Sequence, residues 1–116
     1  MPITIYHNPR CSKSRKALEI LQERSLELNI IEYLKTGFSR DEILSLKEKL
    51  KKEMIDLVRV NEEDFKKLNL NNPSENELVD ALITNPKILQ RPIVIFDDQA
   101  LIARPAEILE ELFRNN

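Results

Sequence analysis

The sequence predicts an α/β protein built on one mixed four-stranded sheet. Three observations predict this class: β-prone runs stand near both ends of the 116-residue chain, a helix-periodic segment joins the first two runs, and the middle is helical. The expected order is strand–helix–strand, a helical insertion, then strand–strand–helix. We expect one domain over residues 1–116, with the insertion at about 39–85, because this length suits a single hydrophobic core.

The N-terminal part has the pattern of a strand–helix–strand unit. Residues 2–6 are β-prone and Pro9 closes the segment, so a first strand is expected there. A helix is expected over residues 12–24, because apolar side chains recur at helical spacing. These side chains are Ala17, Leu18, Ile20 and Leu21. Residues 28–34 are expected to form a second strand, and a helix between two strands implies that they pair in parallel.

Two capping boxes mark helices in the middle of the chain. Each has a serine three residues before a glutamate, namely Ser39 with Glu42 and Ser74 with Glu77. The first helix is expected to reach about residue 52, and the second to stop before the proline at position 86. Shorter helical patterns lie between them, at 55–59 and 62–68. The inner face of the second capped helix is expected to consist of Leu78, Leu82 and Ile83.

The C-terminal part returns to strand patterns. Residues 93–96, Ile-Val-Ile-Phe, form a continuous β-branched and aromatic run that is typical of a buried strand. After a turn at 97–99, residues 100–103 are expected to come back as an antiparallel strand. Pro105 suits the first turn of a last helix. The inner face of that helix is expected to consist of Ile108, Leu109, Leu112 and Phe113.

This order of elements is the thioredoxin-like arrangement. Such folds place a reactive cysteine at the start of the first helix and a proline just before the third strand, which are the positions of Cys11 and Pro92. We therefore predict that the Arg91–Pro92 peptide bond is cis, although only about 5% of X–Pro bonds in folded proteins are.

Composition narrows the function classes. With 18 basic and 20 acidic residues the formal net charge is -2, so nothing global draws the chain to nucleic acid or to an anionic membrane. No apolar run approaches the ~20 residues that a membrane-spanning helix needs, and the opening Met-Pro-Ile-Thr lacks the layout of a signal peptide. We expect a cytoplasmic protein. The single glycine, Gly37, excludes a glycine-rich phosphate loop.

Cys11, the only cysteine, is the candidate nucleophile. A lone cysteine is often a small hydrophobic residue of the core, but Cys11 stands between Arg10 and Ser12, directly after a proline turn. It also opens a helix, whose dipole and unpaired N–H groups favour thiolate over thiol. The position of Cys11 in the sequence therefore favours a reactive thiol over a buried core residue.

Two neighbours of Cys11 each allow two interpretations. Ser14 occupies the place of the second thiol in a Cys-X-X-Cys motif, but a hydroxyl forms no disulfide, so resolution must come from another molecule. Its hydroxyl either bonds the Cys11 sulfur or bonds local backbone. His7 is either an acid, a base or a charge near the thiolate, or a structural hydrogen-bonded residue.

A thiol that acts on an anion needs cations close to it, and arginine binds oxyanions with a planar fork. Arg91 and Arg104 stand out, since each precedes a proline at the end of an expected strand. In a thioredoxin-like sheet the loop at Pro92 packs next to Cys11. Arg59 merely ends a short apolar helical segment, and the pattern alone leaves all three arginines open as ordinary solvated charges.

Several stretches are highly specific in combination. They are Ile5-Tyr6-His7-Asn8-Pro9-Arg10-Cys11-Ser12-Lys13-Ser14-Arg15, Tyr33-Leu34, Ser39-Arg40-Asp41-Glu42, Leu57-Val58-Arg59-Val60-Asn61, Asn85-Pro86, Arg91-Pro92-Ile93-Val94 and Arg104-Pro105. In these stretches the chain closely resembles the glutaredoxin-coupled arsenate reductase (ArsC) family over nearly its whole length. It is most similar to a short subgroup with the motif Asn-Pro-Arg-Cys-Ser-Lys-Ser.

The resemblance implies a role for each candidate residue. The nucleophile would be Cys11. The oxyanion site would consist of Arg59, Arg91 and Arg104. The residues that help to lower the pKa of the thiol would be His7, Ser14 and Arg15.

The resemblance also implies a reaction and its partners. The Cys11 thiolate attacks arsenate, water is lost, glutathione adds to the adduct, glutaredoxin removes the glutathione and arsenite leaves. Glutathione is then a co-substrate and glutaredoxin a partner, with no metal and no bound cofactor. An exposed thiol that must meet glutaredoxin favours a monomer.

Two other functions stay open at this point. A glutathione-dependent monothiol oxidoreductase would act on mixed disulfides or on another oxyanion, although a mixed disulfide carries no compact oxyanion to fill a site of three arginines. A regulator of the Spx type would bind RNA polymerase and sense oxidants, but such sensors generally use a Cys-X-X-Cys pair, which Ser14 removes here.

Overall fold

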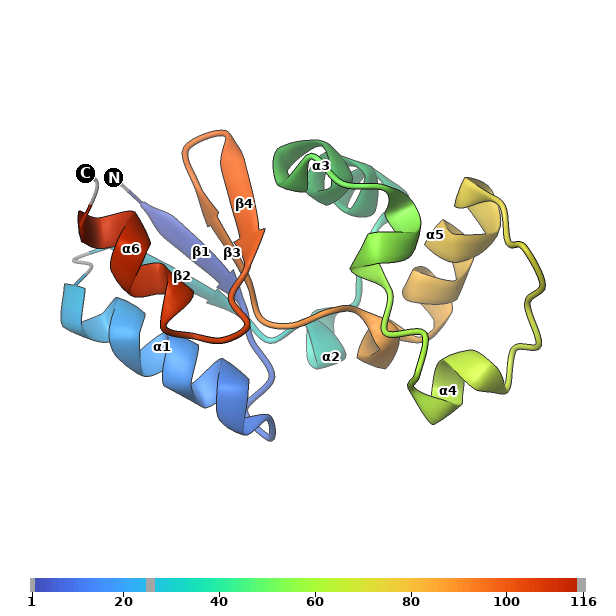
Figure 1. Ribbon diagram of the computed structural model, residues 1–116, viewed down its shortest axis with the longest axis horizontal. Helices are drawn as coiled ribbons and strands as arrows, with labels where there is room; N and C mark the ends of the chain where they lie inside the picture. Colours follow the sequence, from blue (N-terminus) through green and yellow to red (C-terminus); the bar gives the residue numbers. More distant parts are fainter. Residues whose placement is uncertain (1, 25–26, 115–116) are drawn as a thin grey trace. The chain divides into compact units, whose positions relative to one another are not determined.

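The computed structural model describes residues 2–24 and 27–114, with side chains as far as residue 111 (Figure 1). The chain divides into two compact units. Met1–Tyr33 and Arg91–Asn116 form the first, here called the sheet unit, and Leu34–Gln90 form the second, the helical unit. None of the helices in these described ranges is both long and apolar enough to cross a membrane.

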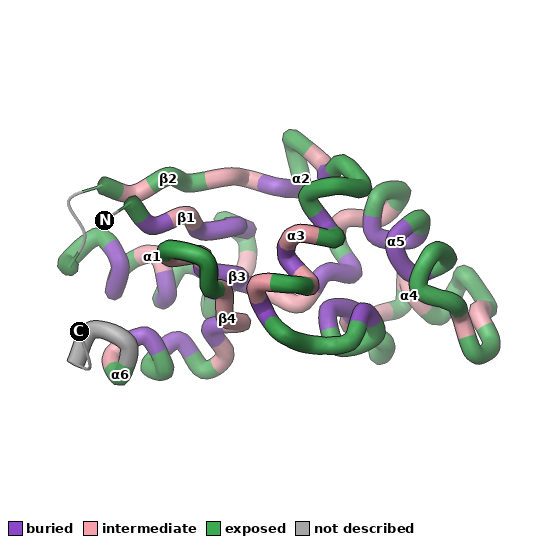
Figure 2. The backbone as a smooth tube through the Cα atoms, turned by 90° about the horizontal axis from the view of Figure 1, so that it is seen from above, coloured by how far each residue is buried: buried purple, intermediate pink, exposed green. Residues whose placement is uncertain are grey.

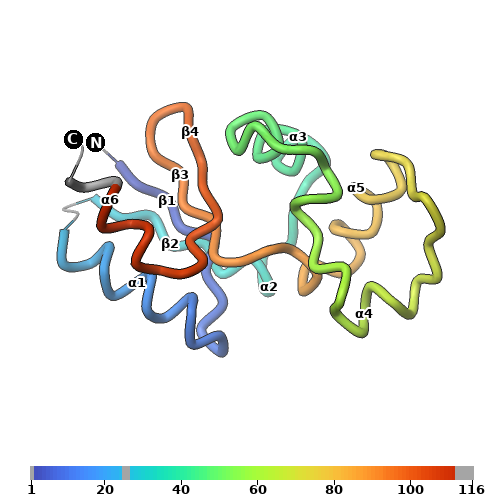
Figure 3. The backbone as a smooth tube through the Cα atoms, in the orientation of Figure 1, coloured from blue at the N-terminus to red at the C-terminus, as the bar shows by residue number. Residues whose placement is uncertain are grey.

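The sheet unit contains the predicted mixed sheet. Its strands are β1 (Ile3–Tyr6), β2 (Leu28–Ile31), β3 (Ile93–Phe96) and β4 (Gln99–Ile102). They lie in the order β2-β1-β3-β4 (Figure 3). β1 and β2 are parallel, whereas β3 is antiparallel to both β1 and β4. The predicted parallel pair and the predicted antiparallel return strand are thus confirmed.

Two helices pack on one face of this sheet. α1 (Ser12–Arg24) and α6 (Ile108–Arg114) contact each other (Figure 1). An ion pair joins them, with Arg24 Nη2 2.6 Å from Glu110 Oε2. The core between helices and sheet consists of Ile3, Ile5, Ala17, Ile20, Leu21, Val94, Ala103, Ala106 and Leu109. The helical spacing along α1 therefore predicted its buried face, since Ala17, Ile20 and Leu21 are all there.

The strand register gathers several loops at one end of the sheet. Tyr6, the last residue of β1, pairs with Ile93, the first residue of β3, and Ile93 pairs with Ile102, the last residue of β4. Beyond the paired residues, Ala103 donates its N–H to the Pro92 carbonyl at 2.9 Å. The segments that follow β1 and β4 and the segment that precedes β3 consequently share one end of the sheet.

The helical unit is organised around one central helix. After α2 (Tyr33–Thr36), its elements are α3 (Arg40–Leu50), η1 (Met54–Leu57), α4 (Glu63–Lys66), α5 (Glu75–Thr84) and η2 (Pro86–Ile88). α5 contacts α3, η1 and η2, and the buried positions of these elements form the inside of the unit (Figure 2). An ion pair between Arg40 and Asp80 also joins α3 to α5.

Both predicted capping boxes are present. Ser39 Oγ accepts the Glu42 N–H at 3.1 Å, and Glu42 Oε1 accepts the Ser39 N–H at 3.0 Å. Ser74 and Glu77 make the same two bonds at 3.2 and 3.0 Å. Each box provides partners for backbone donors that a helix N-terminus would otherwise leave unpaired.

Two predicted element boundaries are wrong. The second strand was expected to continue to residue 34, but it ends at Ile31, and α2 (Tyr33–Thr36) turns the chain. Tyr33 is fully buried there, so tertiary packing overrides its strand propensity. The last helix was expected to start at Pro105 but starts at Ile108. Pro105 instead follows a cis bond and accepts the Ile108 N–H in a turn.

Two residues predicted on inner helix faces are exposed. Ile83 of α5 is 37% exposed and Ile108 of α6 is 39% exposed. At about 100° per residue, each stands at the edge of a buried stripe that is centred elsewhere, on Leu78 and Leu82 in α5 and near Leu109 in α6. The side chains of Leu112 and Phe113 lie outside the described part of the chain.

Candidate active site

The segment between β1 and α1 presents the thiol of Cys11. The Cys11 N–H donates to the Asn8 carbonyl at 3.0 Å, and the Cys11 carbonyl accepts the Arg15 N–H at 3.0 Å, which is the first helical hydrogen bond. Cys11 thus occupies the N-cap position of α1, where the backbone N–H groups of the first turn point outward. This is the placement that the sequence predicts.

Asn8 shapes the turn that leads to Cys11. Its Oδ1 accepts the Arg10 N–H at 3.0 Å, across Pro9. The side chain is 7% exposed, so it is part of the protein interior. The sequence analysis did not select Asn8, although the Asn-Pro dipeptide is a turn signal and a short Asx side chain mimics a backbone turn.

Ser14 is fully buried and its hydroxyl is fixed by two partners. Ser14 Oγ accepts the Asn8 N–H at 3.0 Å and lies 2.7 Å from His7 Nδ1. The hydroxyl proton is therefore available to an unprotonated Nδ1. The contact between Ser14 and the Cys11 sulfur is made by the Ser14 backbone N–H. Of the two interpretations of this side chain, local bonding is the one that the structure contains.

His7 is buried at the end of β1, with 5% of its surface exposed. Burial lowers the pKa of His7 below its ordinary 6.5, and the Arg15 charge lowers the pKa further, while the Glu32 carboxylate raises it. The net effect is a lower pKa, so the imidazole is neutral at pH 7. A neutral imidazole accepts the Ser14 hydroxyl proton at Nδ1 and places no positive charge beside the thiol.

The pKa of the Cys11 thiol is lowered from its ordinary value of 9.0. Partial burial is the largest single influence and raises the pKa, but it is outweighed by groups that stabilise the thiolate. These are the backbone N–H groups of Ser14 and Lys13, together with the charge and a hydrogen bond of the Arg91 side chain. The fraction of thiolate at neutral pH is increased accordingly.

Arg91 brings unused donors to this thiol. The residue is half-buried and precedes Pro92, and the Arg91–Pro92 bond is cis, as predicted. Its Nε and Nη1 are buried and have no hydrogen-bond partner among the described residues. Buried guanidinium N–H groups without partners are rare in folded proteins, because each costs free energy. Here they are available to an oxyanion beside the sulfur.

The remaining arginines differ in their surroundings. Arg15 is exposed, and its Nη1 donates to the Pro9 carbonyl at 2.8 Å, which fixes the turn before Cys11. Arg104 follows β4 at the same end of the sheet, and its bond to Pro105 is also cis. Arg59 belongs to the helical unit, where its Nη1 lies 3.1 Å from Glu62 Oε2.

The sheet unit thus combines a thioredoxin-like sheet, one activated thiol at the start of the first helix, and an arginine with open donors next to the cis-proline. Within residues 2–24 and 27–114, the His, Cys, Asp and Glu side chains form no cluster of three or more that could hold a metal ion. The protein is of the thioredoxin-like class, and its one cysteine stands at the start of the first helix. The model of the ArsC family matches residues 6–112, and the chain belongs to that family.

Known proteins agree with this assignment over almost the whole chain. The uncharacterized protein YfgD of Escherichia coli is 39% identical over 113 residues, which is 95% of each chain. A protein named arsenate reductase from Neisseria meningitidis is 38% identical over 111 residues, 93% of this chain and 95% of the relative. The solved structure of an arsenate reductase from Vibrio cholerae has a TM-score of 0.90 and 38% identity, and the match covers 96% of this chain and 97% of that one. The predicted fold and family are confirmed.

Proposed function

We propose that this protein reduces arsenate to arsenite through the Cys11 thiolate. The observation that carries the proposal is Arg91, which stabilises the thiolate while two of its buried N–H groups have no partner among the described residues. A tetrahedral oxyanion next to the sulfur would accept hydrogen bonds from these charged donors, which are stronger than hydrogen bonds between neutral groups. Relatives that are named arsenate reductase support the same substrate.

The reaction begins with the thiolate as nucleophile. Cys11 sulfur forms a bond to arsenic, and one arsenate oxygen leaves with two protons as water. The thiol of glutathione then displaces a second oxygen as water and forms a second As–S bond. A glutaredoxin thiolate attacks the glutathione sulfur, giving a mixed disulfide, and the electron pair of the broken As–S bond reduces As(V) to As(III). Water hydrolyses the Cys11–As(III) bond and releases arsenite.

The neighbouring residues would prepare the nucleophile. The Ser14 N–H stabilises the thiolate, and the Ser14 hydroxyl joins His7 to the backbone of Asn8. Arg15 fixes the turn before Cys11 through the Pro9 carbonyl. The role of this group in the proposal is to hold the thiolate in place and to keep its pKa low.

The oxyanion site in the proposal consists of three arginines. Arg91 has the direct support described above, and Arg104 follows a strand that ends at the same end of the sheet. The role of Arg59 rests on the family resemblance alone. Substitution of Arg59 by glutamine should raise the KM for arsenate if the resemblance assigns it correctly.

The reductant must come from outside the chain, because the sequence contains one cysteine. We propose glutathione as co-substrate and glutaredoxin as protein partner, with no resident cofactor and no metal. The cytoplasm, where thiols are kept reduced, is the matching compartment. A monomer leaves the thiol open to glutaredoxin.

The test is a coupled assay with purified protein, arsenate, glutathione, glutaredoxin and a system that regenerates reduced glutathione from NADPH. The wild type should oxidise NADPH only when arsenate is added, and Cys11→Ser should abolish the signal. Arsenate-independent deglutathionylation without arsenate reduction would overturn the proposal in favour of a monothiol oxidoreductase. Equal inactivity of the wild type and Cys11→Ser would overturn it outright.

A further inference from the structure

A pocket of about 250 Å³ lies between the first turns of α1 and the segment that precedes α6. Its lining residues are Ser12, Lys13, Lys16, Pro105, Ala106 and Glu107. Ser12 directly follows Cys11 in the chain, and the Lys13 N–H donates a hydrogen bond to the Cys11 sulfur. Cys11 itself is not part of the lining, but two lining residues follow it directly in the chain, and all of the lining belongs to the sheet unit.

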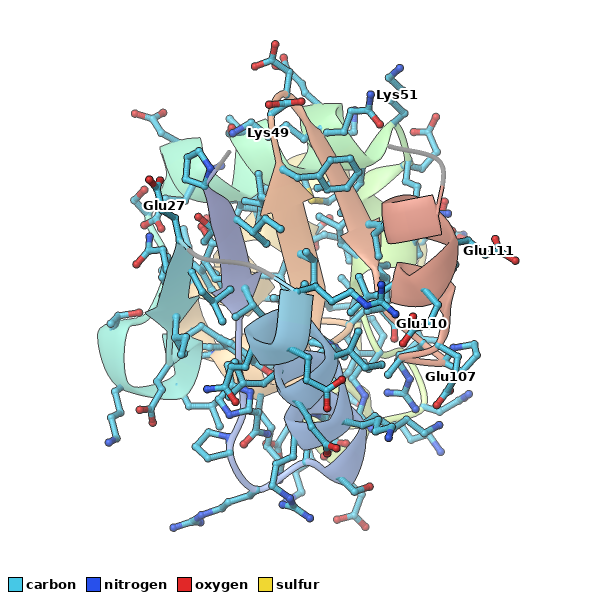
Figure 4. All side chains as sticks on the ribbon, turned by 90° about the vertical axis from the view of Figure 1, so that its left-hand side faces the viewer. Glu27, Lys49, Lys51, Glu107, Glu110 and Glu111 are labelled. Carbon is cyan, nitrogen blue, oxygen red and sulfur yellow. The ribbon has the colours of Figure 1, made fainter. Side chains whose placement is uncertain are left out.

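Three charged side chains surround this pocket without partners. Neither Lys13 nor Lys16 nor Glu107 forms an ion pair with any residue that the structure describes. All three are exposed, and Glu107 stands at the surface of the sheet unit (Figure 4). By contrast, Arg24 near the other end of α1 pairs with Glu110. The three charges that line the pocket are therefore available to a ligand.

We infer that this pocket binds glutathione, with Lys13 and Lys16 as partners of its two carboxylates and Glu107 as partner of its ammonium group. Glutathione carries two carboxylates, one ammonium group and one thiol, and the pocket offers two ammonium groups and one carboxylate. A ligand with a single charge would leave two of these three charged side chains without a partner. The inference deepens the proposed function, because it rests on glutathione as the thiol that resolves the Cys11 adduct.

The position of the pocket also suits the chemistry of that step. A glutathione held by its charged ends at Lys16 and Glu107 would have its thiol free to reach the arsenic on Cys11. The thiol sulfur forms the As–S bond, an As–O bond breaks, and the oxygen leaves as water with the thiol proton. The pocket thereby supplies orientation and proximity, while the neighbouring arginine supplies the oxyanion contacts.

The test uses disulfide exchange, which needs no arsenate. Cys11 thiolate attacks glutathione disulfide, forming Cys11–glutathione mixed disulfide and releasing one glutathione thiolate. Hydroxyethyl disulfide, which is uncharged, reacts with the same thiolate but has no charged groups for the pocket. Rates are measured by intact-protein mass spectrometry, and the ratio of the two second-order rate constants cancels any change in thiolate fraction.

Three variants and one control test whether the pocket binds glutathione through specific ion pairs or only through its net positive charge. The double substitution Lys13→Gln with Lys16→Gln should lower the glutathione disulfide rate about tenfold, since two exposed ion pairs are lost, and leave the hydroxyethyl disulfide rate within about twofold. Lys16→Glu should reduce the ratio further. Glu107→Gln should also lower it. Lys52→Gln, which removes an exposed lysine of the helical unit, should leave the ratio unchanged.

Glu107→Gln is the decisive variant. Removal of a carboxylate would speed the reaction with an anionic disulfide if the lysines acted only through their charge, so an increased ratio overturns the inference. Equal ratios in the wild type and the double variant also overturn it. If the wild type reduces arsenate but none of these variants changes the KM for glutathione, the inference fails and the proposed function stands. If the ratio responds as expected while arsenate is not reduced, the pocket assignment stands and the proposed function fails.

Discussion

At the level of single residues, Arg91 should control the reactivity of Cys11. Its positive charge and hydrogen bond lower the pKa of the thiol, so removal of the guanidinium should raise that pKa. Arg91→Gln should therefore shift the midpoint of the pH dependence of alkylation by iodoacetamide to higher pH. Arg91→Lys, which keeps a charge without the planar fork, should shift it less.

The matched control for this measurement is Arg24→Gln, which removes the same charge near the far end of α1. At that separation in salt-containing buffer, the charge acts weakly on the thiol. The midpoint of Arg24→Gln should coincide with that of the wild type. A shift as large as that of Arg91→Gln would show that net charge, and not the contact with Arg91, sets the thiol pKa.

His7 should make stability depend on pH below neutrality. Burial, the largest influence, lowers its pKa in the folded protein below 6.5, so at slightly acidic pH the unfolded chain binds a proton that the folded chain does not. Stability contributed by this group is complete above 6.5 and is lost as pH falls toward the folded pKa. In urea unfolding, the wild type should lose more stability between about pH 7.5 and 5.5 than His7→Gln does.

The two proteins are compared by how much their free energy of unfolding changes with pH, and not by its absolute value. His7→Gln also removes the partner of Ser14 and should lower stability at every pH. Carboxylates lower the stability of both the wild type and His7→Gln as pH falls. Subtracting one pH dependence from the other removes this shared contribution. A steeper loss in His7→Gln than in the wild type would mean that the imidazole is stabilised in its charged form, contrary to its burial.

At the level of elements, the two capping boxes should each stabilise the helical unit. Ser39→Ala and Ser74→Ala each remove an oxygen that accepts a backbone N–H at a helix start, which should cost about 0.5–2 kcal/mol. Thermal or urea unfolding measures the loss. Ser45→Ala, in the middle of α3, is the control and should be neutral or slightly stabilising, because alanine has the higher helix propensity. Equal effects of Ser45→Ala and Ser39→Ala would contradict the capping role.

Elements with a strong local signal could be predicted from the sequence, and those decided by packing could not. The capped helices and the apolar run at 93–96 have patterns that depend on near neighbours only, and they are found where expected. Tyr33 and Leu34 were predicted to end the second strand, yet Tyr33 is buried and residues 33–36 form a helical turn. The last helix starts at Ile108 because residues 105–108 form a turn, in which the Pro105 carbonyl accepts the Ile108 N–H, and the helical spacing does not reveal this turn.

In the candidate active site, too, features with a local signal could be predicted from the sequence and features that depend on packing could not. Cys11 and Arg91 were predicted from their places next to a turn and a proline; the structure brings them into contact, and their roles in the reaction stay predictions. The bond between Ser14 and His7 joins residues seven apart, and no sequence period brings a strand end to a buried helix position. Asn8 was missed because its role is a turn that forms only with the strand and the helix around it.

At the level of the whole molecule, the site is assembled from two segments that are far apart in the chain. The turn before α1 and the segments around β3 and β4 meet because the antiparallel register aligns the end of β1 with the start of β3. The chain brings cations to the thiol in this way, but it brings no second thiol, since Cys11 is the only cysteine. Both electrons for a two-electron reduction must therefore come from thiols of other molecules, because Cys11 has no partner in the chain with which to form a disulfide.

Arsenate turnover should consequently require glutathione and glutaredoxin together. Replacement of both by thioredoxin and its reductase, with the same supply of NADPH, should abolish turnover, because a protein dithiol does not fill the place of a small thiol on the Cys11 adduct. Oxidation with diamide alone should leave the chain without an internal disulfide, whereas added glutathione should appear on Cys11 by intact mass and be absent from Cys11→Ser. Full turnover with thioredoxin alone would mean that the adduct is resolved directly by a protein thiol, and the glutathione-dependent steps would have to be abandoned.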